Sequence, residues 1–240
     1  MIDWLRASSE TPSLHLAGRD VPVAIRRDRR ARRLTLRLSP DGSEVRLTVP
    51  AWARTAEALA FAKLRSAWLE TQLAKVPQYE PPGAGGTMRF RGTELAIDWR
   101  EGTPRRVRLD EDRLTLGGPE DTLAKRIQRW LEEQALALFA ADLTHYCDLA
   151  AVAAPKIALS RAQRRWGSCS TSGTVRINWR LVQAPDFVRR SVVAHEVAHL
   201  VHFDHSPAFH ALLARLFEGD IAEADRWLKR HGRSLYASFG

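Results

Sequence analysis

The sequence predicts an α+β fold in which β-hairpins, each followed by a helix, precede a helix rich in histidine. Two observations support this fold class. Apolar residues occupy every second position in short runs near the N-terminus, which is the period of half-buried strands. Longer segments place apolar residues three and four positions apart, which is the spacing of amphipathic helices. Two such hairpin-plus-helix units ahead of the histidines define an α+β arrangement.

The first unit consists of alternating strands followed by one helix. Strands are expected at 21–27, 33–39 and 44–50. The stretch 39-SPDGS-43 carries Pro and Asp-Gly, so it predicts a hairpin turn between the last two strands. A single helix is expected over 55–76. Its buried face is expected to contain Leu59, Ala62, Leu69, Leu73 and Val76, widened by Phe61, Leu64 and Trp68.

A loop rich in proline and glycine follows the first helix and marks a domain boundary. The stretch 77-PQYEPPGAGGT-87 predicts a linker. We therefore expect an N-terminal hairpin and helix region over 1–82 and a catalytic domain over 83–240. After the linker, short strands are expected within 88–99, with a turn near Arg91-Gly92, and at 105–110 and 113–118. A long helix is then expected from about Glu120 to about Ala150, bounded by Pro119 and Pro155.

The composition is that of an ordinary globular protein, with 45% hydrophobic and 27% charged residues. No apolar run approaches the ~20 residues of a membrane helix, and the N-terminus lacks the apolar block of a secretory signal. Cys147 and Cys169 do not form a disulfide framework. These features predict a cytoplasmic location without membrane contact. The net charge of +9, with a cluster of arginines over Arg26–Arg37, raises the alternative of a nucleic-acid partner.

The stretch 191-SVVAHEVAHLVHFDHSPAF-209 concentrates the residues that suit metal chemistry. A helix is predicted over 185–202, with Asp186 accepting hydrogen bonds from the free amides at its start. On this helix His195 and His199 lie one turn apart on one face, so both rings can reach one zinc ion. Glu196 lies beside them without ligating, where a carboxylate can take a proton from water.

A third ligand must come from chain that has turned back after this helix. His202 lies on the same face, but seven residues correspond to ~10.5 Å of helical rise, which is too far for both rings to meet one ion. His205 follows Asp204 and precedes Ser206 and Pro207, which predict the start of another helix. We therefore expect His195, His199 and His205 to be the metal ligands, and His202 to be a surface histidine or one that supports a ligand.

A second block indicates the family. The stretch 164-RRWGSCSTSGTVRINWRL-181, followed by the histidine segment, resembles the YgjP-like metallopeptidases, which are related to SprT-like and zincin-type proteins. The resemblance implies a zincin-like metallopeptidase domain with an HExxH active-site helix beside a β-sheet. It also implies zinc ligands at His195, His199 and His205 with a catalytic Glu196. One Zn²⁺ is the expected cofactor, with another divalent metal as an alternative.

The substrate remains open between two classes at this point. In zincin-type proteases the edge strand before the HExxH helix pairs with an extended peptide, and 174-TVRINWR-180 occupies this place in the sequence. A peptide or protein is then the substrate. The alternatives are a metal-dependent nucleoside triphosphate pyrophosphatase, with Arg164, Arg165 and Asn178 as candidate substrate-binding residues, and a DNA-associated SprT-like protease that uses Arg26–Arg37. Arg165, Asn178 and Tyr236 are candidates for stabilising the oxyanion.

Overall fold

The computed structural model describes residues 11–76, 78–170 and 173–239. Pro77, at the start of the predicted linker, and Thr171–Ser172, in the predicted turn before 174–180, lie outside the described residues. The chain divides into two compact units, Met1–Pro77 and Gln78–Gly240. Each unit has a hydrophobic core of its own. Secondary structure is mixed α and β in both units, as predicted.

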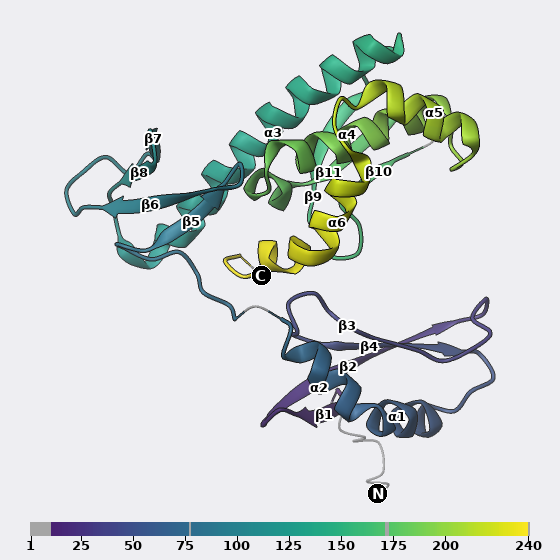
Figure 1. Cartoon of the computed structure of the whole chain (residues 1–240). Coiled ribbons are helices and arrows are strands. Elements are labelled where there is room, and N and C mark those ends of the chain that lie inside the picture. Colours follow the sequence, from purple (N-terminus) through teal and green to yellow (C-terminus); the bar gives the residue numbers. More distant parts are fainter. Residues whose placement is uncertain (1–10, 77, 171–172, 240) are drawn as a thin grey trace, which may run out of the picture. The chain divides into compact units, whose positions relative to one another are not determined.

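The first unit is a four-stranded sheet covered by two helices (Figure 1). Its strands are β1 (Ser13–Leu16), β2 (Arg19–Asp28), β3 (Thr35–Leu38) and β4 (Val45–Pro50), in the order β1-β2-β4-β3. The predicted hairpin between β3 and β4 is confirmed, since the two strands pair antiparallel. Strand β2 pairs with β4 in parallel, which the local pattern did not indicate. The inward apolar residues of the strands pack against the helices.

The helix predicted over 55–76 is two helices, and this part of the prediction is wrong. Helix α1 (Thr55–Leu64) ends before Arg65, which has φ −103° and ψ 14°, and α2 (Ser66–Leu73) starts directly after it. Leu64 and Trp68, which were expected on the buried face, are 85% and 44% exposed.

The second unit starts with another four-stranded sheet, which the strand predictions anticipated. It contains β5 (Thr87–Phe90), β6 (Thr93–Trp99), β7 (Arg108–Asp110) and β8 (Arg113–Leu116), in the order β5-β6-β8-β7. Gly92 in the β5–β6 turn has φ +83°, and a Cβ there would lie 2.9 Å from Pro185 Cα. This position needs glycine both for its conformation and for the close approach of the chain before the histidine helix.

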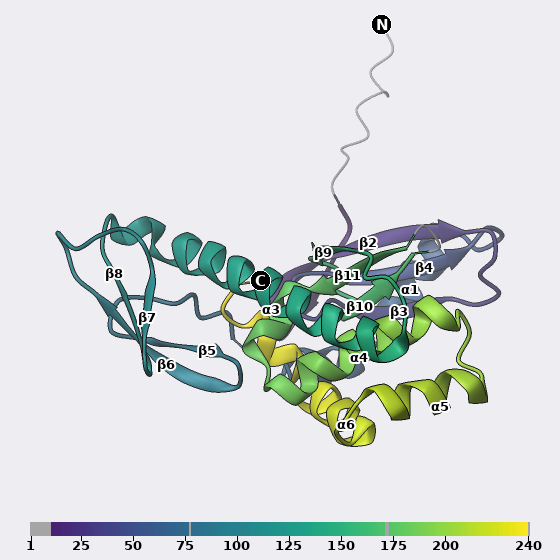
Figure 2. The ribbon, with the colours of Figure 1, turned by 90° about the horizontal axis from the view of Figure 1, so that it is seen from above.

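A long helix connects this sheet to the rest of the unit. After a short 3₁₀ turn, η1 (Glu120–Thr122), helix α3 (Leu123–Ala150) runs from the sheet to the histidine-bearing helix and packs against it (Figure 2). Its apolar residues join the large core, as the helical pattern predicted. Asp142 of α3 accepts a hydrogen bond of 2.7 Å from Nε of Arg189, whose side chain is 4% exposed. This buried ion pair ties the two helices together.

A three-stranded sheet lies beside the histidine helix. It consists of β9 (Lys156–Ser160), β10 (Gly167–Cys169) and β11 (Thr174–Asn178), in the order β10-β11-β9. Strand β11 is central, because it pairs antiparallel with β10 and in parallel with β9. The expectation that 174–180 is an edge strand is therefore wrong. Both hydrogen-bonding edges of β11 are already used, and the edge strand next to it is β10.

The remaining helices complete the second unit. After η2 (Trp179–Gln183), they are α4 (Asp186–Val201), α5 (Pro207–Leu216) and α6 (Ile221–His231), followed by η3 (Gly232–Tyr236). The expectation that Asp186 accepts hydrogen bonds from the free backbone amides at the start of α4 is wrong. The Asp186 carboxylate instead accepts hydrogen bonds from the side chains of Arg91 and Arg189. Within the described part of the chain, no helix has the length and apolar character needed to cross a membrane.

Candidate metal centre

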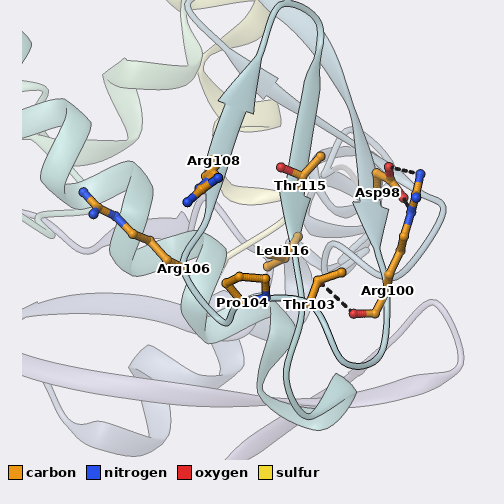
Figure 3. A pocket seen from close by; sticks show the side chains of 8 residues that line it. All are labelled: Asp98, Arg100, Thr103, Pro104, Arg106, Arg108, Thr115 and Leu116. Carbon is orange, nitrogen blue, oxygen red and sulfur yellow. Dashed lines mark hydrogen bonds and ion pairs between the residues drawn. The ribbon is translucent and has the colours of Figure 1, made fainter.

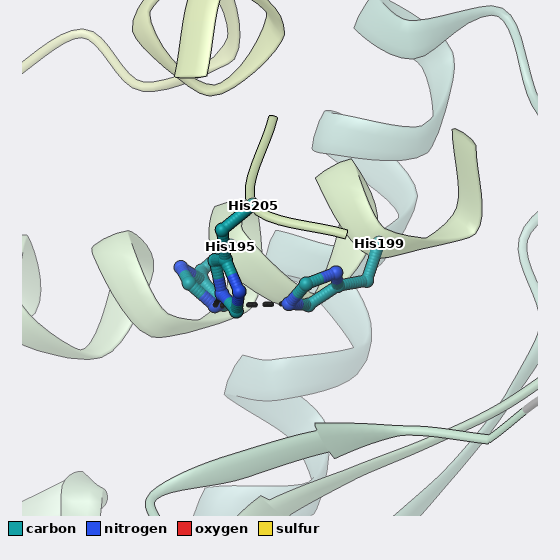
Figure 4. Close-up of side chains that lie close together, drawn as sticks. All are labelled: His195, His199 and His205. Carbon is teal, nitrogen blue, oxygen red and sulfur yellow. Dashed lines mark hydrogen bonds between the residues drawn. The ribbon is translucent and has the colours of Figure 1, made fainter. Parts of the chain in front are cut away.

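Three histidine rings converge at the end of α4 (Figure 4). His195 and His199 lie one turn apart on the helix, and their Nε2 atoms are 3.1 Å apart. His205 follows the end of the helix, and its Nε2 lies 3.3 Å from Nε2 of His195. One ring nitrogen from each residue lies within 4.8 Å of the other two. The fold thus brings together the three histidines that the sequence analysis selected.

The chain turns back to the group through His202 and Ser206. His202 ends α4 in an extended conformation, with φ −127° and ψ 109°. The Ser206 side chain then accepts a hydrogen bond from the amide of Phe209 and so starts α5, with Pro207 at its first position. These predicted helix signals are confirmed. The sharp junction between α4 and α5 is what moves His205 back over the helix that precedes it.

His202 contacts the histidine group through its backbone carbonyl oxygen rather than through its ring. Nδ1 of His199 lies 3.0 Å from His202 O. A carbonyl oxygen only accepts hydrogen bonds, so Nδ1 of His199 carries the proton. In the neutral ring, Nε2 then presents its lone pair to the other two histidines. This is the way in which a hydrogen bond at one ring nitrogen orients the other nitrogen of a histidine ligand.

Phe209 supports the group from the apolar side. Its fully buried ring lies 5.0 Å from the ring of His195, 4.6 Å from that of His199 and 4.8 Å from that of His205. Burial, together with the neighbouring His199, His205 and His210, lowers the pKa of His195 to about 4. His195 is therefore a neutral imidazole at neutral pH, which is the form that binds a metal.

Two of the separations between these nitrogens suit a tetrahedral zinc ion. Zinc binds histidine nitrogen at ~2.0–2.1 Å in tetrahedral geometry, which corresponds to a separation of about 3.3–3.4 Å between two ligand nitrogens. The separations of 3.1 Å and 3.3 Å come close to this value. Neutral imidazole is also a donor that suits zinc. Three protein ligands leave a fourth position open to a substrate or to water.

Glu196 is a buried carboxyl group next to these rings. It is 5% exposed, and burial raises its pKa to about 7. The positive charge of Arg165 and a hydrogen bond from the backbone amide of Cys169 act in the opposite direction. A carboxyl with a pKa near neutrality can both accept and return a proton at the pH of the cell.

Gly167 of β10 makes the room that Glu196 occupies. A Cβ built on Gly167 would overlap Oε1 of Glu196 and lie 2.7 Å from its Cγ and 2.8 Å from its Cδ. Real Cβ atoms are not found at such distances. The carboxyl group therefore rests directly against the backbone of the edge strand, and glycine is required there for space rather than for conformation.

The residues proposed for substrate binding do not gather into one group. Arg164 and Arg165 are exposed, and Arg165 is the one whose charge acts on Glu196. Asn178 is fully buried, and its side chain donates to Ala162 O and accepts from the amide of Arg180. Its amide group is thus occupied by contacts within the protein. Tyr236 is 5% exposed, with its hydroxyl 3.4 Å from Ala162 O.

A hollow on the β5–β8 sheet is lined by none of these residues (Figure 3). It has a volume of about 250 Å³ and lies against β6, β8 and the loop before β7. Asp98, the one carboxylate among the described residues that line it, accepts a hydrogen bond of 2.9 Å from Nε of Arg100. The hollow therefore adds no group to the histidine site.

Three contributors to the site were missed by reasoning from the sequence. They are the space at Gly167, the ring of Phe209 and the carbonyl oxygen of His202. The segments WGSCS and HSPAF contain the first two, so the sequence carried a signal for them, although it assigned no role to either residue. The third is a backbone group, which no side-chain pattern indicates.

A mixed α+β unit with three converging imidazoles beside a buried carboxyl is typical of metal-dependent hydrolases. The family whose description reads YgjP-like, metallopeptidase domain matches residues 32–231. The chain therefore belongs to the YgjP-like metallopeptidase family. Membership supports a hydrolase of the metallopeptidase type and implies a metal, usually zinc.

Among solved structures, the chain is similar to the crystal structure of the metallopeptidase zymogen of Pyrococcus abyssi abylysin. It is 22% identical, with a TM-score of 0.36, over 40% of this chain and 96% of that chain. The comparison with curated proteins gave no match.

Proposed function

We propose that the protein is a zinc-dependent peptidase in which His195, His199 and His205 bind one zinc ion and Glu196 moves protons. The observation that supports this proposal most strongly is that three imidazole rings converge beside a buried carboxyl group. Nε2 of His195 lies 3.1 Å from Nε2 of His199 and 3.3 Å from Nε2 of His205. All four residues belong to the unit Gln78–Gly240. We therefore assign catalysis to that unit. It contains the whole of the zincin-like catalytic domain that the sequence predicted over 83–240.

Bound zinc supplies Lewis-acid chemistry, which polarises a peptide carbonyl and acidifies water. Glu196 accepts a proton from the attacking water as a general base. It then returns this proton to the nitrogen of the leaving amine as a general acid. The buried position of Glu196 favours both steps, because it holds the pKa near 7. Gly167 and the amide of Cys169 hold the carboxyl group at the edge of the sheet.

The edge strand of the sheet supports a peptide as the substrate. Strand β10 is paired on one side with β11 and is the outer strand in the order β10-β11-β9. An extended peptide can add to such an edge through backbone hydrogen bonds, whatever its sequence. Since Gly167 of β10 touches Glu196, a peptide paired there passes beside the carboxyl group. This assigns to β10 the role that was first expected of 174–180.

The two alternative functions have less support from the described contacts. Triphosphate binding calls for several arginine forks that meet at the site, whereas Asn178 is enclosed in the fold and Arg165 acts on Glu196. In the Arg26–Arg37 segment, Arg26 pairs with Asp28 and Arg27 bonds to Ala53 O and Thr55. These contacts are internal to the first unit. Peptide hydrolysis is therefore the function proposed.

Metal analysis combined with a hydrolysis screen tests the proposal. The purified protein should contain close to one zinc per chain and should cleave an unfolded protein, and a chelator should abolish this cleavage. Nucleoside triphosphates form the second arm of the screen. If zinc-loaded protein hydrolyses triphosphates but leaves every peptide intact, the peptidase proposal is wrong and the pyrophosphatase alternative is supported.

A further inference from the structure

A cavity of about 840 Å³ opens beside Glu196 and His195. Three helices each present one face to it. Helix α4 contributes Val192 together with the two site residues, α5 contributes Leu213 and Ala214, and α6 contributes Ile221 and Leu228. The volume lies within the range of ~300–1,000 Å³ that is usual for pockets that bind small molecules. His199 and His205 do not line the cavity, so it extends from the Glu196 side of the histidine group.

The walls of the cavity are mainly apolar. Val192 and Leu213 are 9% and 3% exposed, so their side chains form a rigid inner wall. Ile221 and Leu228 are half-buried on the opposite helix. Ala214 and Ala222 are exposed, which places small side chains at the mouth. A surface of this kind attracts an apolar group, because that group leaves water on entering.

Asp220, Asp225 and Ser191 line the cavity and bond to other groups of the protein. Asp220 accepts a hydrogen bond of 2.7 Å from the amide of Ala222 and pairs with Arg226. Asp225 pairs with Lys229 at 2.5 Å. Ser191 donates to Val188 O. The ring of His210 packs against that of Phe209, with the centroids 5.3 Å apart. The charges that line the cavity are therefore largely balanced, which favours an uncharged occupant.

The position of Glu196 determines which part of a peptide enters the cavity. In the proposed function Glu196 delivers a proton to the nitrogen of the leaving amine, so this nitrogen must come within hydrogen-bond reach of the carboxyl group. The peptide residue that carries this nitrogen is then the one nearest to Glu196. Because the cavity opens beside Glu196, the side chain of this residue lies next to the cavity.

We propose that this cavity is a specificity pocket that binds a large apolar side chain, such as that of Phe or Leu, on the amine side of the scissile bond. The proposal rests on the proposed peptidase function and deepens it by naming the class of substrate. Burial of such a side chain in place of glycine should raise kcat/KM by about tenfold to a hundredfold. Ala214 and Ala222 set the width of the entrance.

Two variants of α5 test the role of the pocket. Ala214→Phe fills the mouth of the cavity. Ala211→Phe makes the same change at an exposed position on the same helix that does not line the cavity, so it is the matched control. Both positions are exposed, and both variants should therefore keep the fold. Circular dichroism and zinc content verify this before any assay.

The assay uses peptides that differ only in the residue on the amine side of one scissile bond, namely Gly, Ala, Leu, Phe, Asp and Arg. Wild-type protein should cleave the Leu and Phe peptides at least tenfold faster than the Gly peptide, as kcat/KM. Ala214→Phe should remove most of this advantage, so that its kcat/KM values for the Leu, Phe and Gly peptides lie within about twofold of one another, whereas Ala211→Phe should behave as wild type. Equal rates for all peptides, or a preference for Asp or Arg, would overturn the pocket.

A binding arm separates failure of the pocket from failure of the peptidase function. The Phe and Gly peptides are titrated calorimetrically into Glu196→Gln protein, with and without Ala214→Phe. If zinc-loaded wild-type protein cleaves none of the peptides, the proposed peptidase function is wrong. Even then, tighter binding of the Phe peptide that Ala214→Phe weakens would support the pocket. Equal binding of the two peptides would rule it out.

Discussion

His202 and His205 both follow α4, but they differ in the atom that they offer to the site. His205 directs its ring nitrogen toward Nε2 of His195, at 3.3 Å, whereas His202 accepts a hydrogen bond through its backbone carbonyl. A backbone carbonyl survives any change of side chain. The two histidines are therefore expected to respond differently to the same substitution, although they are three residues apart.

His205→Ala should strip most of the zinc from the purified protein, while His202→Ala should leave close to one zinc per chain. The reason is that alanine removes a proposed ligand in the first variant but keeps the carbonyl that orients His199 in the second. Zinc content measured by atomic emission on proteins purified side by side decides the matter. Equal zinc in both variants would show that His205 is not a ligand.

Glu196→Gln should retain both the fold and the zinc but lose about 10²–10⁴-fold in kcat, which is the usual contribution of a general acid–base group. Glutamine has nearly the same shape and still fits against Gly167, so the loss reflects proton transfer alone. Steady-state kinetics with an unfolded protein substrate measures it. Turnover within tenfold of wild type would remove Glu196 from the mechanism.

Gly167→Ala should lower kcat strongly without loss of zinc. The added Cβ would overlap the carboxyl group of Glu196, so this side chain must move away from its position at β10. Ser168→Ala, at the next position of the same strand, is the control, because it adds no atom. The comparison requires kcat and zinc content for both variants. An unchanged kcat in Gly167→Ala would mean that the position of Glu196 tolerates displacement.

At the scale of elements, the start of α4 is held by charges from two directions. Asp186 accepts hydrogen bonds from Arg91 of the β5–β6 turn and from Arg189 of its own helix. Burial raises the pKa of Asp186, but the hydrogen bond from Arg91 and the positive charges of Arg189 and Arg190 outweigh it, so the pKa lies below its ordinary value. The helix that carries His195 is thereby fixed to the sheet that precedes α3.

Asp186→Asn should reduce stability more at pH 7 than at pH 3. A carboxyl group whose pKa is lowered by folding stabilises the fold above its unfolded-state pKa of ~3.9, and this contribution is lost as the pH falls toward the folded-state value. The wild type therefore loses an advantage on acidification that the variant never had. Urea unfolding at both pH values measures the difference. A gap between the two proteins that widens at pH 3 would contradict this account.

At the scale of the whole molecule, the two hydrophobic cores share no residue. One core is built from Leu14 to Leu73 and the other from Met88 to Leu235. His195, Glu196 and His199 lie on α4 of the second unit, and the ring of His205 packs against Phe209 of the second core. Each unit thus has the apolar interior that a separately folding domain needs.

A fragment of residues 78–240 should therefore fold alone and bind zinc with the stoichiometry of the full chain. The measurements are the circular dichroism spectrum, a cooperative thermal transition and the zinc content. The full chain carried through the same purification is the reference. A fragment without a cooperative transition would show that the first unit is required for the fold of the second.

Much of this molecule follows from local pattern. Alternation and helical spacing predicted most strands and helices, and the signals at Ser206 and Pro207 predicted where α5 begins. The rise along a helix was enough to prefer His205 over His202. The predictions of strands, helices and helix starts succeed because each depends on residues close together in the chain, where backbone geometry is nearly fixed.

Pairing between distant segments was decided only by the tertiary structure. The parallel pairing of β2 with β4 and the central place of β11 depend on which strand lies next to which, and an alternating pattern is the same for an edge strand and a central one. The contact of Gly167 with Glu196 likewise joins residues far apart in the sequence. The sequence by itself thus selected the chemical groups of the candidate site. Packing decided their surroundings, because contacts across the core leave no periodic trace in the chain.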